Sequence, residues 1–214
     1  MEKRPKCKIC RRAGKKLFLK GEKCNTAKCP MVVKPYPPGI KGKRRLGGLS
    51  EYGRQLKEKQ RLKNWYNLSE KQFKNYVIAV LEKSRGGKSQ MGDAQEALVK
   101  SLEMRLDNAI YRLGIGSSRT KSRQLVSHGH FFVNGKAIDI PSFTLKVGDK
   151  ITVRPSSLNK GNFKELSATL KKIQLPLWLK LDPEKIEAEV IGYPTVDIAA
   201  PPAEIQAIFE FYSK

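Results

Sequence analysis

The sequence has no long hydrophobic run. Its longest uninterrupted apolar stretch is the six residues from Tyr76 to Leu81, whereas a helix that crosses a bilayer needs about 20. The N-terminus is charged and leads into no apolar segment, so we expect no signal peptide. These absences argue against a membrane-embedded protein and predict a cytosolic one.

Acidic residues are also scarce. The chain has 20 Asp and Glu against 43 Lys and Arg, which gives 214 residues a formal net charge of +23. Such a surplus repels itself in the folded state unless a polyanion neutralises it. The charge is uneven, because residues 1–46 hold 16 Lys and Arg while residues 183–214 carry a net charge of −4. The sequence therefore predicts a nucleic-acid-binding protein. An acidic membrane surface is the second partner to consider, but we expect no membrane partner, and no small-molecule substrate, for this chain.

Catalytic signatures are missing. No G-x-S-x-G pattern occurs, and Gly87-Lys88-Ser89 resembles the end of a phosphate-binding loop whose first glycine is replaced by Glu82. We therefore expect no enzymatic activity. A zinc-dependent DNA-binding regulator is a further alternative, but such proteins usually carry a dimerisation element, and no coiled-coil heptad pattern is present.

Cysteine is confined to the first 29 residues, in the order Cys7-x2-Cys10-x13-Cys24-x4-Cys29. Two short pairs separated by a longer loop can place four thiolates around one ion, and four protein ligands leave no open position for catalysis. We expect the neighbouring Lys and Arg to lower the thiol pKa values. The spacing thus predicts one structural zinc ion, with an iron–sulfur cluster as the less favoured alternative.

The hydrophobic periodicity predicts an α+β chain. Helical spacing covers residues 51–66, 70–85, 94–113, 117–127, 162–173 and 205–211, and residues 175–204 have an irregular pattern. Alternation predicts a hairpin over 131–138, turning at Asn134-Gly135, followed by strands over 144–147 and 150–154.

A second basic block spans residues 102–154. Arg119 and Arg123 stand four residues apart, so on a helix they should project from one face, with Lys121 beside them. Ser117, Ser118 and the free N–H groups at the helix start suit a phosphate oxygen. We interpret His128 and His130 as contact residues rather than metal ligands, because no third ligand is near in the sequence.

Residues 105–136 (RLDNAIYRLGIGSSRTKSRQLVSHGHFFVNGK) resemble the αL RNA-binding domain named after small-subunit ribosomal protein four. The cysteine head, Tyr36-Pro37-Pro38-Gly39, the segment from Tyr52 to Gln60 and the ending Glu210-Phe211-Tyr212-Ser213 are similar to bacterial members of that ribosomal protein family itself. The resemblance covers nearly the whole chain.

This resemblance implies a structural constituent of the small (30S) subunit. It implies direct binding to 16S ribosomal RNA, nucleation of the subunit body at the 5′ domain, and contacts with small-subunit protein five, other small-subunit proteins and incoming mRNA. Contributions to translational accuracy and repression of the protein's own operon are further implications. The fold implied is a helical domain into which the αL domain is inserted.

Four segments are expected: a metal-binding basic head over 1–45, a helical part over 46–101, the αL domain over 102–165, and a C-terminal segment over 166–214 that returns to the helical domain. The residues expected to contact RNA are basic, polar or aromatic and lie in the first three segments. They are Lys3, Arg4, Lys6, Arg11, Arg12, Lys15, Lys16, Lys43, Arg44, Arg45, Tyr52, Arg54, Gln55, Lys57, Lys59, Gln60, Arg61, Arg112, Ser117, Ser118, Arg119, Lys121, Arg123, Gln124, His128, His130, Asn134 and Lys136.

Overall fold

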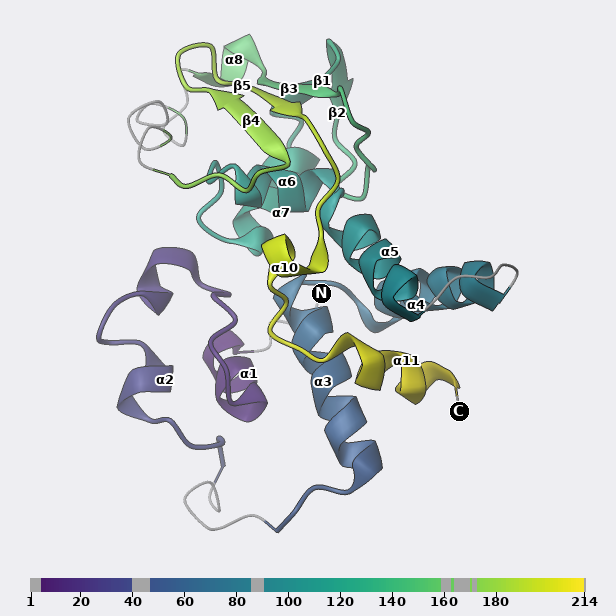
Figure 1. The fold of residues 1–214 in the computed structure, drawn as a ribbon. Helices are drawn as coiled ribbons and strands as arrows, with labels where there is room; N and C mark the ends of the chain where they lie inside the picture. The colour runs from purple at the N-terminus through teal and green to yellow at the C-terminus, as the bar shows by residue number, and fades with distance from the viewer. Residues whose placement is uncertain are drawn as a thin grey trace. The chain divides into compact units, whose positions relative to one another are not determined.

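In the computed structural model, which describes residues 5–39, 47–85, 91–158, 163, 170 and 173–213, the chain forms two compact units. The first comprises Met1–Gln95 together with Pro201–Lys214, and the second comprises Glu96–Ala200. The chain therefore leaves the first unit, builds the second, and returns with its last residues (Figure 1).

The first unit is built from helices. They are α1 (Lys6–Ala13), the 3-10 helix η1 (Gly21–Cys24), α2 (Pro30–Val33), α3 (Glu51–Trp65), α4 (Glu70–Arg85) and the C-terminal α11 (Ile205–Ser213). A capping box starts α4, because the Gln72 N–H donates to Ser69 Oγ at 3.2 Å while the Ser69 N–H donates to Gln72 Oε1 at 3.4 Å. The helices expected at 51–66, 70–85 and 205–211 are confirmed.

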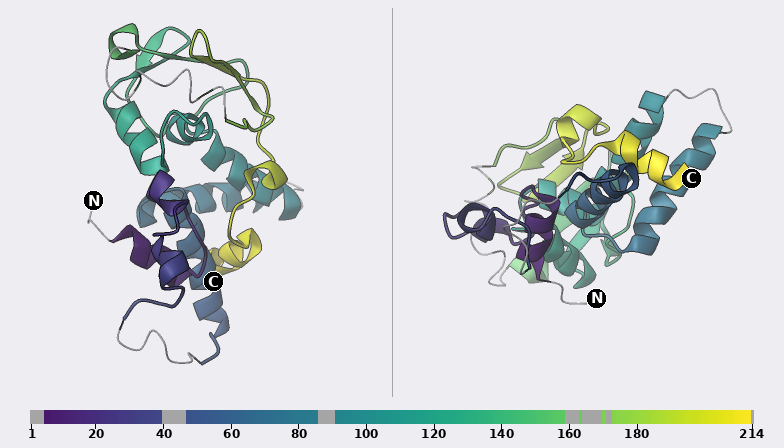
Figure 2. Two further views of the ribbon diagram at one scale, coloured as in Figure 1. Left: turned by 90° about the vertical axis from the view of Figure 1, so that its left-hand side faces the viewer. Right: turned by 90° about the horizontal axis from the view of Figure 1, so that it is seen from below.

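The apolar face of α11 holds the first unit together. Ile205, Ala207, Ile208 and Phe209 are buried, and α11 packs against α3 and α4. Figure 2 shows the yellow C-terminal helix beside the blue α3 in both of its views. The last residues of the chain thus complete a core begun more than a hundred residues earlier.

The single helix expected over 94–113 is wrong. The structure has α5 (Met91–Glu103) and α6 (Leu106–Arg112), separated at Met104 and Arg105. The N–H groups of Leu106 and Asp107 donate to the carbonyls of Phe143 and Pro141 at 2.9 and 3.1 Å, and Leu145 N–H donates to Met104 O. The backbone bonds with this distant segment replace those that would have continued the helix.

The second unit carries a five-stranded antiparallel sheet in the order β2-β1-β3-β5-β4. Its strands are β1 (Phe131–Val133), β2 (Lys136–Ile138), β3 (Lys150–Val153), β4 (Leu179–Asp182) and β5 (Glu187–Val190). The predicted hairpin is confirmed, and Asn134 and Gly135 both have positive φ, as a type I′ turn requires. The strand expected at 144–147 is not formed, because Thr144 makes only an isolated bridge to Arg105.

Strands β4 and β5 correct the expectation of an irregular tail. Leu179 and Leu181 alternate with polar residues, as do Ala188 and Val190, but each run is only four residues long. Because these strands join β3, the expected boundary at 165/166 lies inside the second unit. The helix expected over 162–173 falls mainly outside the described residues.

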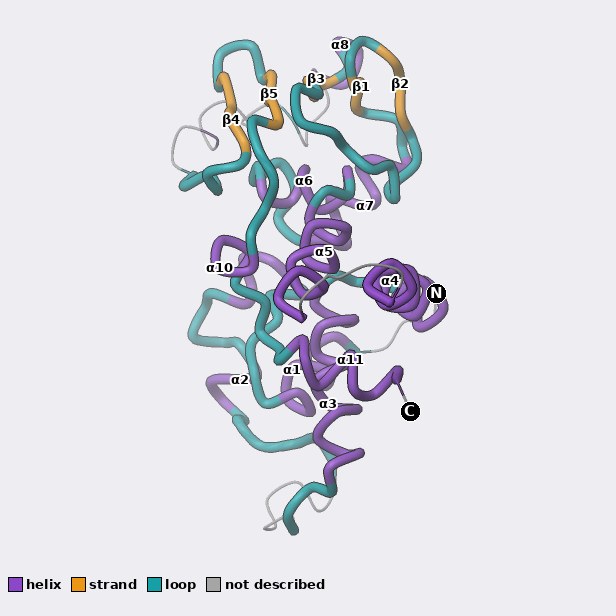
Figure 3. The backbone as a smooth tube through the Cα atoms, turned by 45° about the vertical axis from the view of Figure 1, so that its right-hand side comes forward, coloured by secondary structure: helices purple, strands orange, loops and turns teal. Residues whose placement is uncertain are grey.

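One hydrophobic core joins the sheet to its helices. Phe131, Val133, Ile151 and Val153 point inward from the strands and share the core with Ile110, Leu113, Leu125 and Val126 of the α6 and α7 (Arg119–Ser127) region. Figure 3 shows the strands in orange with α6 and α7 below them. Short helices α8 (Pro155–Leu158) and α10 (Val196–Ala199) complete this unit's described helices, so the α+β class is confirmed. Of the helices described, none is long and apolar enough to cross a membrane.

Candidate nucleic-acid interface

Helix α7 is the centre of the predicted RNA-binding block. Ser118 caps it, with its Oγ accepting a hydrogen bond from Lys121 N–H at 3.3 Å. The helix packs against α6, and Ser122, Leu125 and Val126 are buried on the side that faces the core. The polar side chains that face solvent lie on the opposite side of the helix.

Arg119 does not project into solvent, contrary to expectation. Its Nε donates to Asn108 Oδ1 at 2.9 Å, its guanidinium carbon lies 4.4 Å from the centroid of the Tyr111 ring, and only 7% of the residue is exposed. Asn108 in turn donates to Glu103 Oε2 at 2.7 Å. The helix places Arg119 on the side that packs against α6, so this cation belongs to a buried network.

Arg112 belongs to the same network. Its guanidinium donates twice to the Glu103 carboxylate, at 2.8 Å each, and once to Ala199 O at 2.9 Å. Glu103 is fully buried, and a buried carboxylate needs such charge-assisted partners. Arg112 therefore stabilises the interior instead of adding a free cation to the surface.

Arg105 and Asp107 form a second buried ion pair. Arg105 binds Asp107 at 3.0 and 2.7 Å, and Arg123 Nη1 lies 3.6 Å from the same carboxylate. The Arg123 side chain remains 25% exposed, so it can still present part of its guanidinium to solvent. Two acidic residues of this block, Glu103 and Asp107, are thus occupied by partners in the interior.

The predicted residues of this block that reach solvent are Ser117, Lys121, Arg123, Gln124 and His128 on or next to α7, and Lys136 on β2. We call this set the α7 surface. Ser117, Gln124, His128 and Lys136 are exposed, and Lys121 and Arg123 are half-buried. All six are predicted from the sequence as RNA contacts. The sequence alone does not distinguish them from neighbouring predicted contacts that point inward, such as Arg119.

His130 and Asn134 have structural partners. The Nδ1 atom of His130 lies 2.9 Å from Ser157 Oγ, and its ring packs edge-on against Phe163. Asn134 donates to Asp149 Oδ1 at 2.8 Å and accepts from Lys150 N–H at 2.9 Å, which fixes the hairpin turn. Neither side chain needs RNA to explain its position.

On α3, several predicted RNA contacts are buried inside the first unit. Gln55 donates to Glu210 at 3.1 Å, Lys59 donates to Glu70 at 2.6 Å, and Arg61 donates to Ala13 O at 3.0 Å while pairing with Glu58. The first partner lies on α11, which packs on α3, and the second is the first residue of α4. Arg54 stays exposed, Lys57 and Gln60 are half-buried, and Tyr52 packs its exposed ring 5.5 Å from Phe211.

Two lysines beside Glu70 lower the pKa of its carboxyl group. Burial by itself would raise the pKa of Glu70, but hydrogen bonds and charge from Lys59 and Lys63 outweigh it and lower the pKa to about 2. The Tyr212 hydroxyl also donates to Glu70 at 3.2 Å. Burial, followed by the charge and hydrogen bond of Glu70, raises the pKa of Tyr212. This cluster ties α3, α4 and α11 together.

Arg11 supports the chain after the cysteine head. Its Nε donates to Tyr36 O at 2.8 Å, and its guanidinium carbon lies 4.8 Å from the centroid of the Tyr36 ring. Arg12, Lys15 and Lys16 are exposed, with Lys15 donating to Pro202 O, and Lys6 is half-buried. Lys3, Arg4, Lys43, Arg44 and Arg45 lie outside the described residues.

Beside Arg11 lies a groove of about 300 Å³ whose lining includes Lys8, Lys28 and Lys34. These three lysines were not selected from the sequence. Because lysine is common throughout the head, only the fold reveals which lysines converge.

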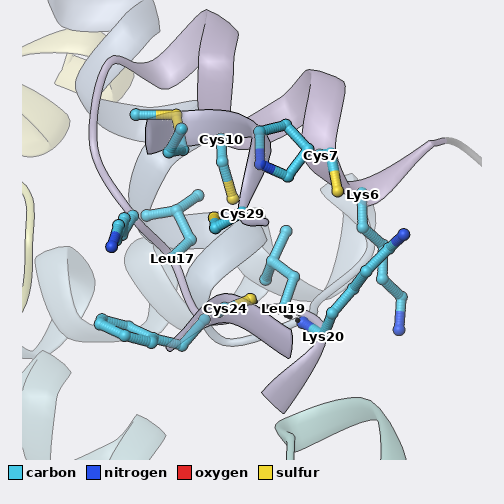
Figure 4. A pocket seen from close by; sticks show the side chains of 12 residues that line it. Lys6, Cys7, Cys10, Leu17, Leu19, Lys20, Cys24 and Cys29 are labelled. Carbon is cyan, nitrogen blue, oxygen red and sulfur yellow. Dashed lines mark hydrogen bonds between the residues drawn. The ribbon is translucent and has the colours of Figure 1, made fainter. Parts of the chain in front are cut away.

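All four cysteines line one pocket in the head, together with Leu17 and Leu19 (Figure 4). Cys10, Cys24 and Cys29 are buried, Cys7 is half-buried, and Lys20 N–H donates to Cys24 Sγ at 3.4 Å. Burial and the charges of the other cysteines raise the pKa of Cys10, so the expected lowering is wrong for this thiol. Within the described residues, no group of three or more Cys, His, Asp or Glu has a metal-holding arrangement.

Comparison with known sequences finds relatives that match 97–98% of the chain. The family "Ribosomal protein S4/S9 N-terminal domain" matches residues 2–103, and the "S4 domain" matches residues 104–151. The "Small ribosomal subunit protein uS4" of Caldicellulosiruptor saccharolyticus is 46% identical, covering 98% of this chain and 97% of the relative. The protein of the same name from Thermotoga maritima is 40% identical, with the same shares covered. "Small ribosomal subunit protein uS4A" of Clostridium perfringens is 48% identical over 97% of this chain and 96% of its own. The chain therefore belongs to the uS4 family of small ribosomal subunit proteins.

Proposed function

We propose that this chain is a structural, non-enzymatic constituent of the small ribosomal subunit that binds ribosomal RNA through the α7 surface. Its relatives are named as small ribosomal subunit proteins along nearly their full length. The observation that carries the RNA assignment is the set of cations that reach solvent in this block: Lys136 of β2 is exposed, and Lys121 and Arg123 are half-buried on the capped helix α7. The nearby Glu103 and Asp107 are occupied by internal pairs.

This arrangement suits a folded RNA backbone. Arginine and lysine neutralise phosphates, and exposed serine, glutamine and histidine side chains can bind phosphate oxygens or 2′-hydroxyls. Further phosphate contacts come from the first unit, where Arg12, Lys16 and Arg54 are exposed. A multi-site clamp of this kind explains the net charge of +23.

The finer assignments follow from likeness to the family. They are direct binding to the 5′ domain of 16S ribosomal RNA, nucleation of the subunit body, contacts with small-subunit protein five and incoming mRNA, a role in translational accuracy, and repression of the protein's own operon. Of these, direct binding to RNA has physical support, because a charge of +23 repels itself in the folded chain and a polyanion would neutralise it.

We further propose that the four cysteines hold one structural zinc ion. The donor set fits zinc, because four sulfur ligands line one pocket and a backbone N–H points at one of them, as is usual around metal-bound thiolates. Zinc would supply no chemistry beyond joining the segments that carry the ligands. The energy of binding would stabilise the folded head.

The zinc proposal is tested by metal analysis and by a ligand variant. We expect one zinc ion per chain, and we expect Cys24→Ser to lose it and to unfold residues 1–45 while the second unit stays folded. Elemental analysis and the amide spectrum of the labelled protein measure both effects. Iron in place of zinc, or an amide spectrum that is unchanged after mutation or chelation, would contradict the proposal.

The RNA proposal is tested by the salt dependence of binding to small-subunit ribosomal RNA. Each phosphate contact contributes a slope of about −0.7 to −0.9 in a plot of log affinity against log salt concentration. We expect Lys121→Ala and Lys136→Ala each to weaken binding. Each should also make the slope shallower by the contribution of about one phosphate contact. Lys185→Ala, which removes an exposed lysine from the turn between β4 and β5, is the control. A flat salt response would overturn the proposal.

A further inference from the structure

The outward face of the sheet carries an aromatic side chain that the core does not use. Phe132 alternates along β1 with Phe131 and Val133, which are buried in the core, so its ring lies on the opposite face. It is half-buried, between Ala137 of β2 and Thr152 of β3 in the strand register. These neighbours are short, and the ring stays partly open to solvent.

One cation lies beside this ring, and a second lies on the same face of the sheet. The guanidinium carbon of Arg154 lies 5.8 Å from the centroid of the Phe132 ring, and Arg154 is exposed. Its backbone N–H donates to His130 O at 2.8 Å, which holds it beside β1. Lys150 lies two residues before Thr152 on the same face of β3 and is also exposed. A ring with an adjacent arginine is the combination that stacks bases and binds phosphates in single-stranded RNA.

The charges across the sheet limit the extent of this surface. Glu187 and Glu189 of β5 stand opposite Thr152 and Lys150, and Glu187 lies 3.7 Å from Lys150 Nζ. Phosphates are therefore repelled at the β5 side and attracted at Arg154. A single half-buried ring among polar side chains also offers too little apolar surface for the core of a protein–protein interface. Nucleic acid fits this face better than another protein.

We propose that the outward face of β1 and β3 is a second RNA site, at which an unpaired base stacks on Phe132 and its phosphate binds Arg154. The site rests on the proposed ribosomal-RNA-binding function. It is separate from the α7 surface, because α6 and α7 belong to the core on the inward face of the sheet.

A tryptophan reporter tests this site in the full-length protein. Phe132→Trp keeps an aromatic platform, and the two native tryptophans, Trp65 and Trp178, are 8% and 2% exposed and contribute a steady background. Tyr193→Trp is the matched control, because Tyr193 is an exposed aromatic of the same unit that lies outside the proposed site. The probes are a short oligouridine and an RNA duplex of equal charge.

We expect the oligouridine to quench the emission of the Phe132→Trp protein but not that of the Tyr193→Trp protein, and the duplex to quench neither. We also expect Phe132→Thr, which retains a good strand former, to weaken oligouridine binding at least about fivefold. Equal quenching of both reporters, or unchanged affinity of Phe132→Thr, would overturn the second site. If Phe132→Thr instead lost only the association with another small-subunit protein, the face would be a protein contact and the site would also be overturned.

The two proposals fail in different ways. Suppose that the wild-type protein binds small-subunit ribosomal RNA with the expected salt dependence, but that oligouridine does not quench Phe132→Trp selectively and binds Phe132→Thr as tightly as the wild type. Only the proposal of a second site is then overturned. If the wild-type protein binds none of these RNAs, the proposed function fails as well.

Discussion

Individual basic residues have two different structural roles, although the composition counts them alike. Lys59, Arg61, Arg105 and Arg119 are buried and paired, whereas Arg12, Lys16, Arg54 and Lys136 face solvent. The sequence could not separate the two groups, because the deciding partners can be distant: Arg61 meets Ala13, 48 positions away, only in the folded chain. On α3, the predicted RNA contacts Gln55, Lys59 and Arg61 are therefore residues with internal partners in the fold.

Glu70 gives the clearest prediction at this scale. Glu70→Gln removes the carboxylate that pairs with the buried ends of Lys59 and Lys63, at 2.6 and 3.0 Å. Because Glu70 is half exposed, solvent screens the pair, and we expect a loss of about 1 kcal/mol in the free energy of unfolding at pH 7. Denaturant unfolding of the variant and of Glu82→Gln, an exposed glutamate on the same helix, measures the effect.

The pH dependence follows from the lowered pKa. Glu70 has a pKa of about 2 in the folded chain against 4.5 as the ordinary value, so its contribution is fully present above pH 4.5 and is lost as the pH falls toward 2. We expect the stability difference between the wild-type protein and Glu70→Gln to shrink across this window. A difference that is constant from pH 7 to pH 3 would contradict this account of the cluster.

At the scale of elements, local patterns predict helices and hairpins well, and long-range backbone pairing less well. The Ser69–Gln72 capping box and the Asn134-Gly135 turn are both formed as expected, because each is decided by residues within a few positions. The break between α5 and α6 depends on carbonyls of Phe143 and Pro141. Strands β4 and β5 are each four residues long, too short for alternation to be distinguished from chance.

Gly114, which ends α6, supplies a prediction for this element. It has φ of +74°, and a Cβ added there would lie 2.1 Å from Ile173 Cδ1. We expect Gly114→Ala to reduce the free energy of unfolding by about 2–4 kcal/mol, through backbone strain plus overpacking. Gly129, with φ of +67° and no atom within 4 Å of its Cβ position, is the control for strain alone.

Gly129→Ala should therefore reduce the free energy of unfolding by only about 1–2 kcal/mol. Thermal or denaturant unfolding of the two variants separates the contribution of the contact with Ile173 from that of the backbone. Equal losses for both would mean that Ile173 moves aside, and that close packing at the end of α6 contributes nothing.

At the scale of the whole molecule, the sequence predicted the α+β class, the αL-type domain and the ribosomal family, and the relatives confirm the family. These predictions succeed because they depend on composition and on motifs spread along the chain. The extent of the second unit could not be predicted, since Glu96–Ala200 is set by the pairing of β3 with β5. The assignment of individual residues to an RNA surface depends on burial, which only the fold provides.

The central claim is that this chain recognises ribosomal RNA of the small subunit. The most direct measurement is to incubate the purified protein with total cellular RNA at moderate salt, with excess tRNA as competitor, and to sequence the fragments that remain bound after nuclease trimming. The account predicts one compact set of fragments from the 5′ domain of 16S ribosomal RNA. Recovery of tRNA, of fragments from the large subunit, or of no preferred sequence would contradict it.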